Sequence, residues 1–452
     1  MSVPVDRPRL AKFRAREEAA FLGRTPRSAE LRARAARHLP SAVPMPWMAG
    51  LYPTPPIYAA SGAGARFRDV DGNEYLDFNV CDLSMCAGFG PAPVVEAVAR
   101  QVADGAHFLL PTEEAVWVAE ELARRVGLPF WQATLSATGA NTEVLRLARF
   151  ATGREQVVVF QGHYHGHLDE TLVRLGDAGL EPEGEGLPRS VTAATRVLPF
   201  NDLEALEAAL ASREVALVLM EPALTNCNIV LPAPGYLAGV RALTERYGTL
   251  LCIDEAHTFQ FAYGGLTRAW KLGADFVVLG KGLGSGISFG LYGMSEALGD
   301  LVSRHLATDT GPKGLATGGT TYASALALAA ARATLESLLR PEDYARVIRL
   351  GERLADGIEA AIAAAGLPWR AFRLGPRSGY CLAPELPRNG AQAKLSLDGD
   401  WINARRLFMA NRGVWDAIQS AGPQASLVHV EADIDRYVAL AGEFLGEIGS
   451  GA

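Results

Sequence analysis

One lysine of this chain stands in a glycine-rich segment directly after a short apolar run. The run is Phe276–Leu279, and Lys281 has a glycine on either side, Gly280 and Gly282. Glycine lets the backbone approach a ligand closely, and lysine is rarely buried without a purpose. A partly desolvated, unprotonated amine is what Schiff-base chemistry requires. The alternative interpretation is an exposed loop lysine.

Three other apolar runs also precede polar residues that could do chemistry. Short runs that are apolar on both faces are typical of buried parallel strands, and ligands of such sheets bind outside the carboxyl ends of the strands. We therefore expect the polar residues after these runs to line one crevice together with Lys281. The runs are Val157–Phe160 before Tyr164, Ala216–Met220 before Glu221, and Leu250–Ile253 before Asp254.

The segment Ser136–Thr142 predicts a phosphate site between a short apolar run and a helix that we expect to begin near Thr142. Small residues leave backbone N–H groups exposed there, and the helix N-terminus adds the positive end of its dipole. The hydroxyls of Ser136 and Thr138 can donate to phosphate oxygens. The alternative is a capped helix start in a tight strand-to-helix turn.

Asp254 ends an apolar run, where its carboxylate needs a cationic or hydrogen-bonding partner. A pyridinium N–H would serve, and this pairing would keep the ring protonated as an electron sink. A salt bridge to a lysine or arginine at the end of the sheet is the alternative. A lysine, a buried aspartate and the aromatic ring of Tyr164 around a phosphate site suggest an enzyme that uses pyridoxal 5'-phosphate (PLP).

Other cofactors fit the same segments less well. His163, His165 and His167 alternate along the chain and could converge on a metal ion, but no carboxylate or cysteine stands at a recognisable ligand spacing. We therefore expect no metal and assign Tyr164 as a flat ring against a planar cofactor, with core packing as the alternative. The loop 280–286 lacks the strict G-x-G-x-x-G frame, so a nicotinamide-dependent oxidoreductase is a remote alternative.

The composition is that of an ordinary globular protein. The chain has 452 residues, 49% hydrophobic and 21% charged, and its net charge of -7 gives no electrostatic signature of nucleic-acid binding. Its five cysteines form no CxxC pair and their number is odd, which favours a reducing cytoplasm over a disulfide framework. The first residues lack the apolar core of a signal peptide, and no apolar run is long enough to span a bilayer.

The order of helical and strand-like segments predicts two domains. From about 91 to 325 the segments alternate, which is typical of an α/β domain with a mostly parallel sheet. Beyond about 326, long helical patterns with short strands between them indicate a smaller α+β domain. We expect residues 76–325 to form the large cofactor-binding domain and residues 326–452 to form the small one, which residues 1–75 would join. A turn at 71–73 predicts a hairpin between strands at 65–69 and 74–78.

Several motifs stand in a characteristic order along the chain. Each is weak alone, but their order and spacing together are highly specific. In chain order they are Asp69-Val70-Asp71-Gly72-Asn73, Arg146-Leu147-Ala148-Arg149, Thr152-Gly153-Arg154, Gly162-His163-Tyr164-His165-Gly166-His167, Glu221-Pro222, Asn226, Asp254-Glu255, Lys281 and Gly319-Thr320. With these motifs the chain resembles the class III PLP-dependent aminotransferases, in the branch similar to glutamate-1-semialdehyde aminomutase. The likeness covers about 57 to 330 and, more loosely, the tail.

The resemblance implies a role for each matching residue. Lys281 would form the Schiff base with PLP and move the proton, and Asp254 would pair with the ring nitrogen. The other positions would hold the cofactor: Tyr164 and Ala256 on the two faces of the ring, Ala137 and Thr138 at the phosphate, Glu221, Asn226 and His257 near the ring substituents, and Thr320 at the phosphate of the neighbouring subunit.

The phosphate turn departs from the family pattern, because the usual Ser-Gly-Thr-Glu is Ser136-Ala137-Thr138-Gly139 here. Together with further departures at 88–92, at 256–261 and at Ser324, this change leaves the cofactor chemistry intact and favours an acceptor other than the aminomutase substrate. The resemblance implies the fold type I architecture of PLP-dependent transferases and a homodimer with shared active sites. It also implies ping-pong transfer of an amino group from an amine or amino acid to a carbonyl acceptor. An intramolecular aminomutase or an amino-acid epimerase with the same residues is the alternative within the family.

Overall fold

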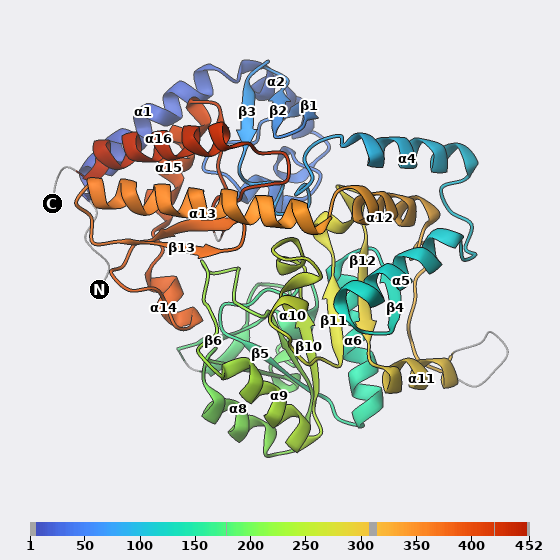
Figure 1. Ribbon diagram of the computed structural model, residues 1–452. Coiled ribbons are helices and arrows are strands. Elements are labelled where there is room, and N and C mark those ends of the chain that lie inside the picture. The colour runs from blue at the N-terminus through green and yellow to red at the C-terminus, as the bar shows by residue number, and fades with distance from the viewer. Residues whose placement is uncertain (1–5, 178, 307–313, 420, 450–452) are drawn as a thin grey trace. The chain divides into compact units, whose positions relative to one another are not determined.

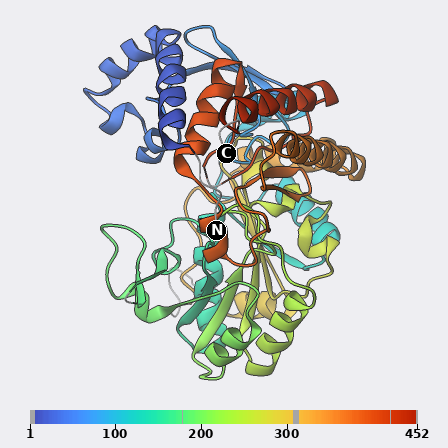
Figure 2. The ribbon, with the colours of Figure 1, turned by 90° about the vertical axis from the view of Figure 1, so that its left-hand side faces the viewer.

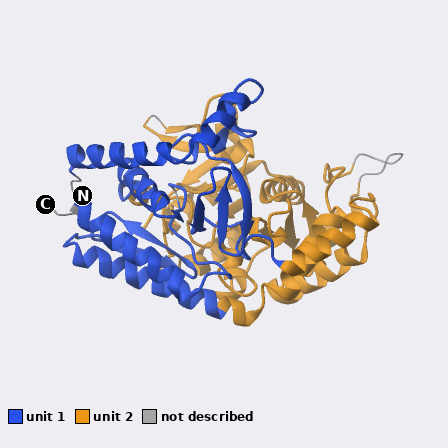
Figure 3. Cartoon of the chain, turned by 90° about the horizontal axis from the view of Figure 1, so that it is seen from above, with its two compact units in different colours: residues 1–91, 345–386, 394–452 blue, residues 92–344, 387–393 orange. Residues whose placement is uncertain are grey.

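The chain forms two compact units, coloured separately in Figure 3. The structure, a computed structural model, describes residues 6–177, 179–306, 314–419 and 421–449. Unit 1 comprises 1–91, 345–386 and 394–452, and unit 2 comprises 92–344 and 387–393. The boundaries expected at 75/76 and 325/326 lie before the points at 91/92 and 344/345, where the chain passes from one unit to the other. The division into three segments remains a prediction.

A seven-stranded sheet forms the centre of unit 2 (Figures 1 and 2). Its strand order is β4-β12-β11-β10-β9-β5-β8, and only β12 runs antiparallel to its neighbours. This confirms the expected α/β fold with a mostly parallel sheet. The strands are β4 (Phe130–Thr134), β5 (Gln156–Phe160), β8 (Thr195–Leu198), β9 (Val215–Met220), β10 (Leu250–Asp254), β11 (Phe276–Leu279) and β12 (Gly290–Met294).

The four apolar runs singled out in the sequence are strands of this sheet. β9 and β11 are buried at every residue, which explains why their sequences show no polar alternation. The runs occupy the adjacent strands β11, β10, β9 and β5 and are parallel, so their carboxyl ends share one edge of the sheet. The residues that follow them are thereby brought to that edge.

Helices cover both faces of the sheet in unit 2. The connection from β4 through α6 to β5 and the connection from β9 through α9 to β10 run in opposite directions along the strand order. Right-handed crossovers therefore place α6 and α9 on opposite faces, as Figure 2 shows. The helices are α4 (Ala92–Asp104), α5 (Glu113–Val126), α6 (Ala137–Thr152), α7 (Val191–Ala194), α8 (Leu203–Leu210), α9 (Tyr236–Tyr247), α10 (Gly265–Ala269), α11 (Glu296–Arg304) and α12 (Ala325–Ser337).

Unit 1 combines segments from distant parts of the chain. Its four-stranded sheet has the order β1-β2-β3-β15, in which the expected hairpin β2–β3 pairs antiparallel and β15 joins β3 in parallel. The strands are β1 (Ala59–Ala63), β2 (Arg66–Asp69), β3 (Glu74–Asp77) and β15 (Val414–Trp415), and a separate pair is β13 (Arg370–Leu374) with β14 (Arg377–Cys381). The main helices are α1 (Arg7–Gly23), α2 (Pro26–Ala35), α3 (Pro46–Gly50), α15 (Gly399–Asn411), α16 (Glu431–Gly449) and most of α13 (Pro341–Ala364).

One core runs through unit 1 and joins its N-terminal and C-terminal segments. Leu10 and Phe13 of α1 pack with Phe408 of α15 and Phe444 of α16 in this buried cluster. Within the described part of the chain, none of the helices has the length and apolar character needed to cross a membrane.

Candidate active site

The start of α6 lies at the turn where we expect the phosphate, but the helix begins earlier than predicted. It starts at Ala137 instead of near Thr142, because Ser136 caps it by accepting a hydrogen bond from the backbone N–H of Gly139 (3.3 Å). Ala137 and Thr138 therefore lie in the first helical turn, where backbone N–H groups have no partner within the helix. This placement gives the turn the geometry of an anion site.

Close backbone contacts surround this turn. A Cβ on Gly290 of β12 would stand 2.3 Å from the carbonyl carbon of Ser136, and one on Gly280 would stand 3.1 Å from the Cβ of Ala137. A Cβ on Gly166 would stand 2.1 Å from the Oγ1 of Thr138. The helix start thus lies directly against the residue preceding Lys281 and against the segment that carries Tyr164.

The hydroxyl of Thr138 is fixed by this second neighbour. Its Oγ1 accepts a hydrogen bond from the backbone N–H of His167 (3.3 Å). The hydroxyl proton then points away from that donor and can be donated to a phosphate oxygen. Two predicted site segments are therefore brought together at the phosphate turn.

Asp254 lies at the carboxyl end of β10 and is 4% exposed. Its Oδ2 accepts hydrogen bonds from His165 Nδ1 and Asn141 Nδ2, both 2.8 Å away, and its Oδ1 accepts from the backbone N–H of Ala256 (3.0 Å). Burial alone would raise the pKa of Asp254, but the hydrogen bond and charge of His165, with the bonds from Ala256 and Asn141, hold that pKa below its usual value.

The partners of Asp254 differ from those of the structural salt bridge considered above. Its oxygens accept from donors on α6, in the 163–167 segment and at Ala256, the second residue after β10. Because Oδ1 accepts one bond where a carboxylate oxygen has two lone pairs, it can take a further N–H. An ionised, buried carboxylate with a spare lone pair fits the ring nitrogen of PLP.

His165 and Asn141 are site residues that the sequence did not reveal. Both are buried, and the Nε2 of His165 and the Oδ1 of Asn141 have no hydrogen-bond partner among the described residues. Nδ1 of His165 carries the proton that is donated to Asp254. His163 also bonds to protein groups, since its two ring nitrogens lie 2.5 and 2.9 Å from the carbonyl oxygens of Phe160 and Thr171.

A second hydrogen-bond chain joins Glu221, Asn226 and His257. Glu221, after β9, accepts from Asn226 Nδ2 (3.1 Å) and from both the backbone N–H (3.1 Å) and the hydroxyl of Thr225. The Oγ1 of Thr225 is 2.7 Å from Nδ1 of His257. The sequence did not identify Thr225, although it links Glu221 to His257. Burial raises the pKa of Glu221 above its usual value.

Lys281 begins a short 3-10 turn directly after β11. Its φ of 49° lies in the left-handed region, which costs a non-glycine residue about 1–2 kcal/mol. Strain of this kind is concentrated at functional sites. β11 and β10 are neighbours and pair in register from Cys252 with Phe276 to Asp254 with Val278. Lys281 therefore follows the strand next to that of Asp254, three positions beyond its paired residue.

Tyr164 and Thr320 are the exposed members of the predicted set. Tyr164 is 43% exposed, which contradicts the alternative of core packing, and its ring meets that of His167 edge to face at 6.4 Å. Thr320 is exposed in a segment whose Tyr322 places its hydroxyl 3.2 Å from where a Cβ on Gly139 would stand. The segment of Thr320 therefore approaches the first turn of α6 in the same chain.

Comparison with known proteins identifies the family. The sequence pattern of the class III aminotransferases (Aminotransferase class-III) matches residues 49–368. The chain is 33% identical over 402 residues to the glutamate-1-semialdehyde 2,1-aminomutase of Desulfitobacterium hafniense (strain DSM 10664 / DCB-2), covering 87% of this chain and 92% of that protein.

Solved structures agree with this assignment. A glutamate-1-semialdehyde aminomutase variant from Pseudomonas aeruginosa PAO1, in complex with PMP, superposes with a TM-score of 0.94 at 37% identity, covering 99% of this chain and all of that one. An omega-transaminase from Sphaerobacter thermophilus superposes with a TM-score of 0.86 at 28% identity, covering 95% of this chain and 100% of that one. The chain belongs to the class III aminotransferases and is a PLP-dependent enzyme of fold type I.

Proposed function

We propose that this enzyme transfers an amino group between two small molecules in a ping-pong reaction, with Lys281 and Asp254 as its catalytic residues. The observation that carries the proposal is the buried carboxylate of Asp254, held by His165 and Asn141 on the strand next to the one that leads to Lys281. PLP, when bound, supplies an electron sink for the electrons of a broken C–H bond.

Each proposed residue contributes a separate task. Asp254 keeps the ring nitrogen protonated, and its own pKa below the usual value leaves it ionised to do so. The amine Nζ of Lys281 would take the proton from the substrate carbon and deliver it to C4′ of the cofactor. Ala137 and Thr138 would hold the phosphate at the start of α6, Tyr164 and Ala256 would contact the two faces of the ring, and Glu221, Asn226 and His257 would lie near its substituents.

A reaction with the amino donor alone separates transfer from isomerisation. In a transferase, the donor should convert the bound cofactor stoichiometrically to its pyridoxamine form and release a carbonyl compound before any acceptor is added. The second candidate is an intramolecular aminomutase, because several of the similar proteins bear that name. Continuous isomerisation of one substrate, with no carbonyl compound released and no acceptor needed, would establish the second candidate instead.

We also propose that the enzyme works as a cytoplasmic homodimer in which Thr320 completes the phosphate site of the neighbouring subunit. Mixed dimers of Lys281→Ala and Thr320→Ala subunits test this. If Thr320 acts across the interface, one site carries both lesions and the other carries none, so about half of the activity should remain. In the opposite case Thr320 acts in its own subunit, where Tyr322 of the same segment approaches α6. Nearly complete loss of activity would place Thr320 in its own subunit's site.

A further inference from the structure

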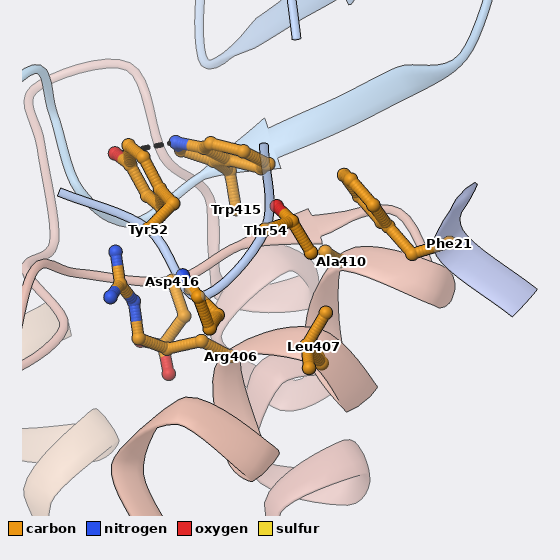
Figure 4. Close-up of a pocket in the computed structure, with 9 residues that line it drawn as sticks. Phe21, Tyr52, Thr54, Arg406, Leu407, Ala410, Trp415 and Asp416 are labelled. Atoms are coloured by element: carbon orange, nitrogen blue, oxygen red, sulfur yellow. Dashed lines mark hydrogen bonds between the residues drawn. The ribbon is translucent and has the colours of Figure 1, made fainter. Parts of the chain in front are cut away.

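Unit 1 contains a second site that the proposed reaction does not use. A small cavity lies between α15 and the segment after α3, with room for about one water molecule. One side is apolar and is formed by Phe21 and Leu407, and the other side carries Arg406, Tyr52 and Trp415 (Figure 4). The cavity therefore combines a cationic wall with an apolar wall.

Arg406 is a buried cation that lacks a carboxylate partner. It is 4% exposed, and among the described residues no acidic side chain forms an ion pair with it. Its Nη2 donates to the carbonyl oxygen of Leu51 (2.6 Å), and its guanidinium lies 4.4 Å from the ring centre of Tyr52. Its Nε–H, buried beside the cavity, has no hydrogen-bond partner in the described chain.

The carboxylate that lines the cavity, that of Asp416, is already used by other groups. Asp416 accepts from Arg405 Nε (2.7 Å), from the hydroxyl of Tyr437 (3.1 Å) and from the backbone N–H of Ala417 (2.8 Å). Arg405 and Asp416 offset each other in charge, which leaves Arg406 without a carboxylate of its own among the residues that line the cavity. A buried charge without a counterion is costly, which favours a bound anion.

Tyr52 supplies a second donor at the same cavity. Its hydroxyl oxygen accepts a hydrogen bond from Trp415 Nε1 (2.7 Å), drawn as the dashed line in Figure 4. No described residue accepts the hydroxyl proton of Tyr52. Burial raises the pKa of Tyr52, so the proton is retained and can be donated. Two donors without acceptors thus border a space large enough for a single small group.

We propose that this cavity binds a small monovalent anion, a chloride ion or the end of a carboxylate group, through Arg406 and Tyr52. The room for about one water molecule excludes phosphate and sulfate, and the single charge of Arg406 matches a monovalent ligand. The anion would fix the segment around Leu51 and Tyr52 to α15. This inference does not depend on the proposed reaction.

Thermal unfolding of the full chain with its cofactor tests the inference. Chloride or formate replaces methanesulfonate, a monovalent anion without a carboxylate and too large for the cavity, at constant ionic strength. The unfolding midpoint should rise and then saturate, because an anion at ten times its Kd multiplies the folded-to-unfolded ratio about elevenfold. Arg406→Met should abolish this response. Arg412→Met is the matched control, since Arg412 also belongs to this region and lies over an aromatic ring, Phe408, but does not line the cavity.

A crystal of the unaltered protein soaked in bromide gives an independent test if Arg406→Met fails to fold. The anomalous signal should show bromide beside Nε of Arg406. A stronger response to formate than to chloride would identify a carboxylate as the preferred ligand, and the reverse would identify a halide. An equal response in wild type and Arg406→Met would overturn the proposal, as would an ordered water in the cavity with no bromide.

Discussion

Replacing Gly166 by alanine should weaken cofactor binding without any change to a group that contacts the cofactor. Gly166 has a φ of 90°, and a Cβ there would stand 2.1 Å from the Oγ1 of Thr138. Thr138 must then turn or shift, because its Cβ would be only 2.8 Å away as well. The alanine would therefore displace the hydroxyl that we expect to donate to the phosphate.

The size of this effect follows from the bond that is lost. A hydrogen bond to a charged group contributes about 1.5–3 kcal/mol, which corresponds to about 10- to 150-fold in affinity. The affinity of the apoenzyme for PLP, measured by absorbance titration, should fall by that factor in Gly166→Ala. The strain of placing alanine at positive φ adds a stability loss of about 1–2 kcal/mol, visible in the thermal unfolding midpoint.

Gly153→Ala is the matched control. Gly153 ends α6 with a φ of 67°, and a Cβ there would meet no atom within 4 Å. This variant should lose stability through the same backbone strain and keep its affinity for PLP. If Gly166→Ala binds PLP as tightly as Gly153→Ala does, then Thr138 does not hold the phosphate in the way proposed.

Two further predictions concern the pairing of Asp254 and the pH dependence of stability. Asp254→Asn should fold and bind PLP but lose turnover by several orders of magnitude, because an amide cannot keep the ring nitrogen charged; near-normal kcat in a folded variant would make Asp254 structural. Burial lowers the pKa of His429 to about 4, and its Nδ1 accepts from the backbone N–H of Ser426 (2.9 Å). In the unfolded chain this histidine takes up a proton near pH 6.5. The contribution of neutral His429 to the free energy of unfolding is therefore complete above that pH and is lost as the pH falls towards 4, by about 3 kcal/mol in total. His429→Asn should flatten this part of the stability profile, and an unchanged slope would contradict it.

The sequence predicted the fold well where a segment's own pattern determines its structure. All four apolar runs are strands with bounds within one residue of those predicted, because full burial imposes an uninterrupted apolar run. β12 escaped prediction because glycine fills two of its five positions. The helix α6 begins earlier than predicted. The small residues after Ser136 resemble a loop, but Ser136 is the N-cap of the helix.

The candidate site was predicted less completely for a different reason. The residues at strand ends could be named because parallel strands bring their carboxyl ends together. Asn141, His165 and Thr225 were missed because their hydrogen bonds join segments that are far apart in the chain, such as α6 and β10. The local sequence pattern does not indicate hydrogen bonds between residues that are far apart in the chain. The position of Asp254 therefore does not predict which side chains will donate to it.

Unit 1 is assembled from N-terminal and C-terminal segments of the chain, and this has a consequence for biosynthesis. β3 has β15 as its parallel neighbour, and β15 leaves the ribosome roughly 340 residues after β3, which at about 5–20 residues per second takes on the order of 20–70 s. Until then α1 lacks the apolar partners that α15 and α16 provide. The nascent chain therefore carries an incomplete N-terminal region while the whole of residues 92–344 emerges and can collapse. During that interval the apolar side of α1 is a natural substrate for chaperones, and slower translation of the final helices would prolong its exposure.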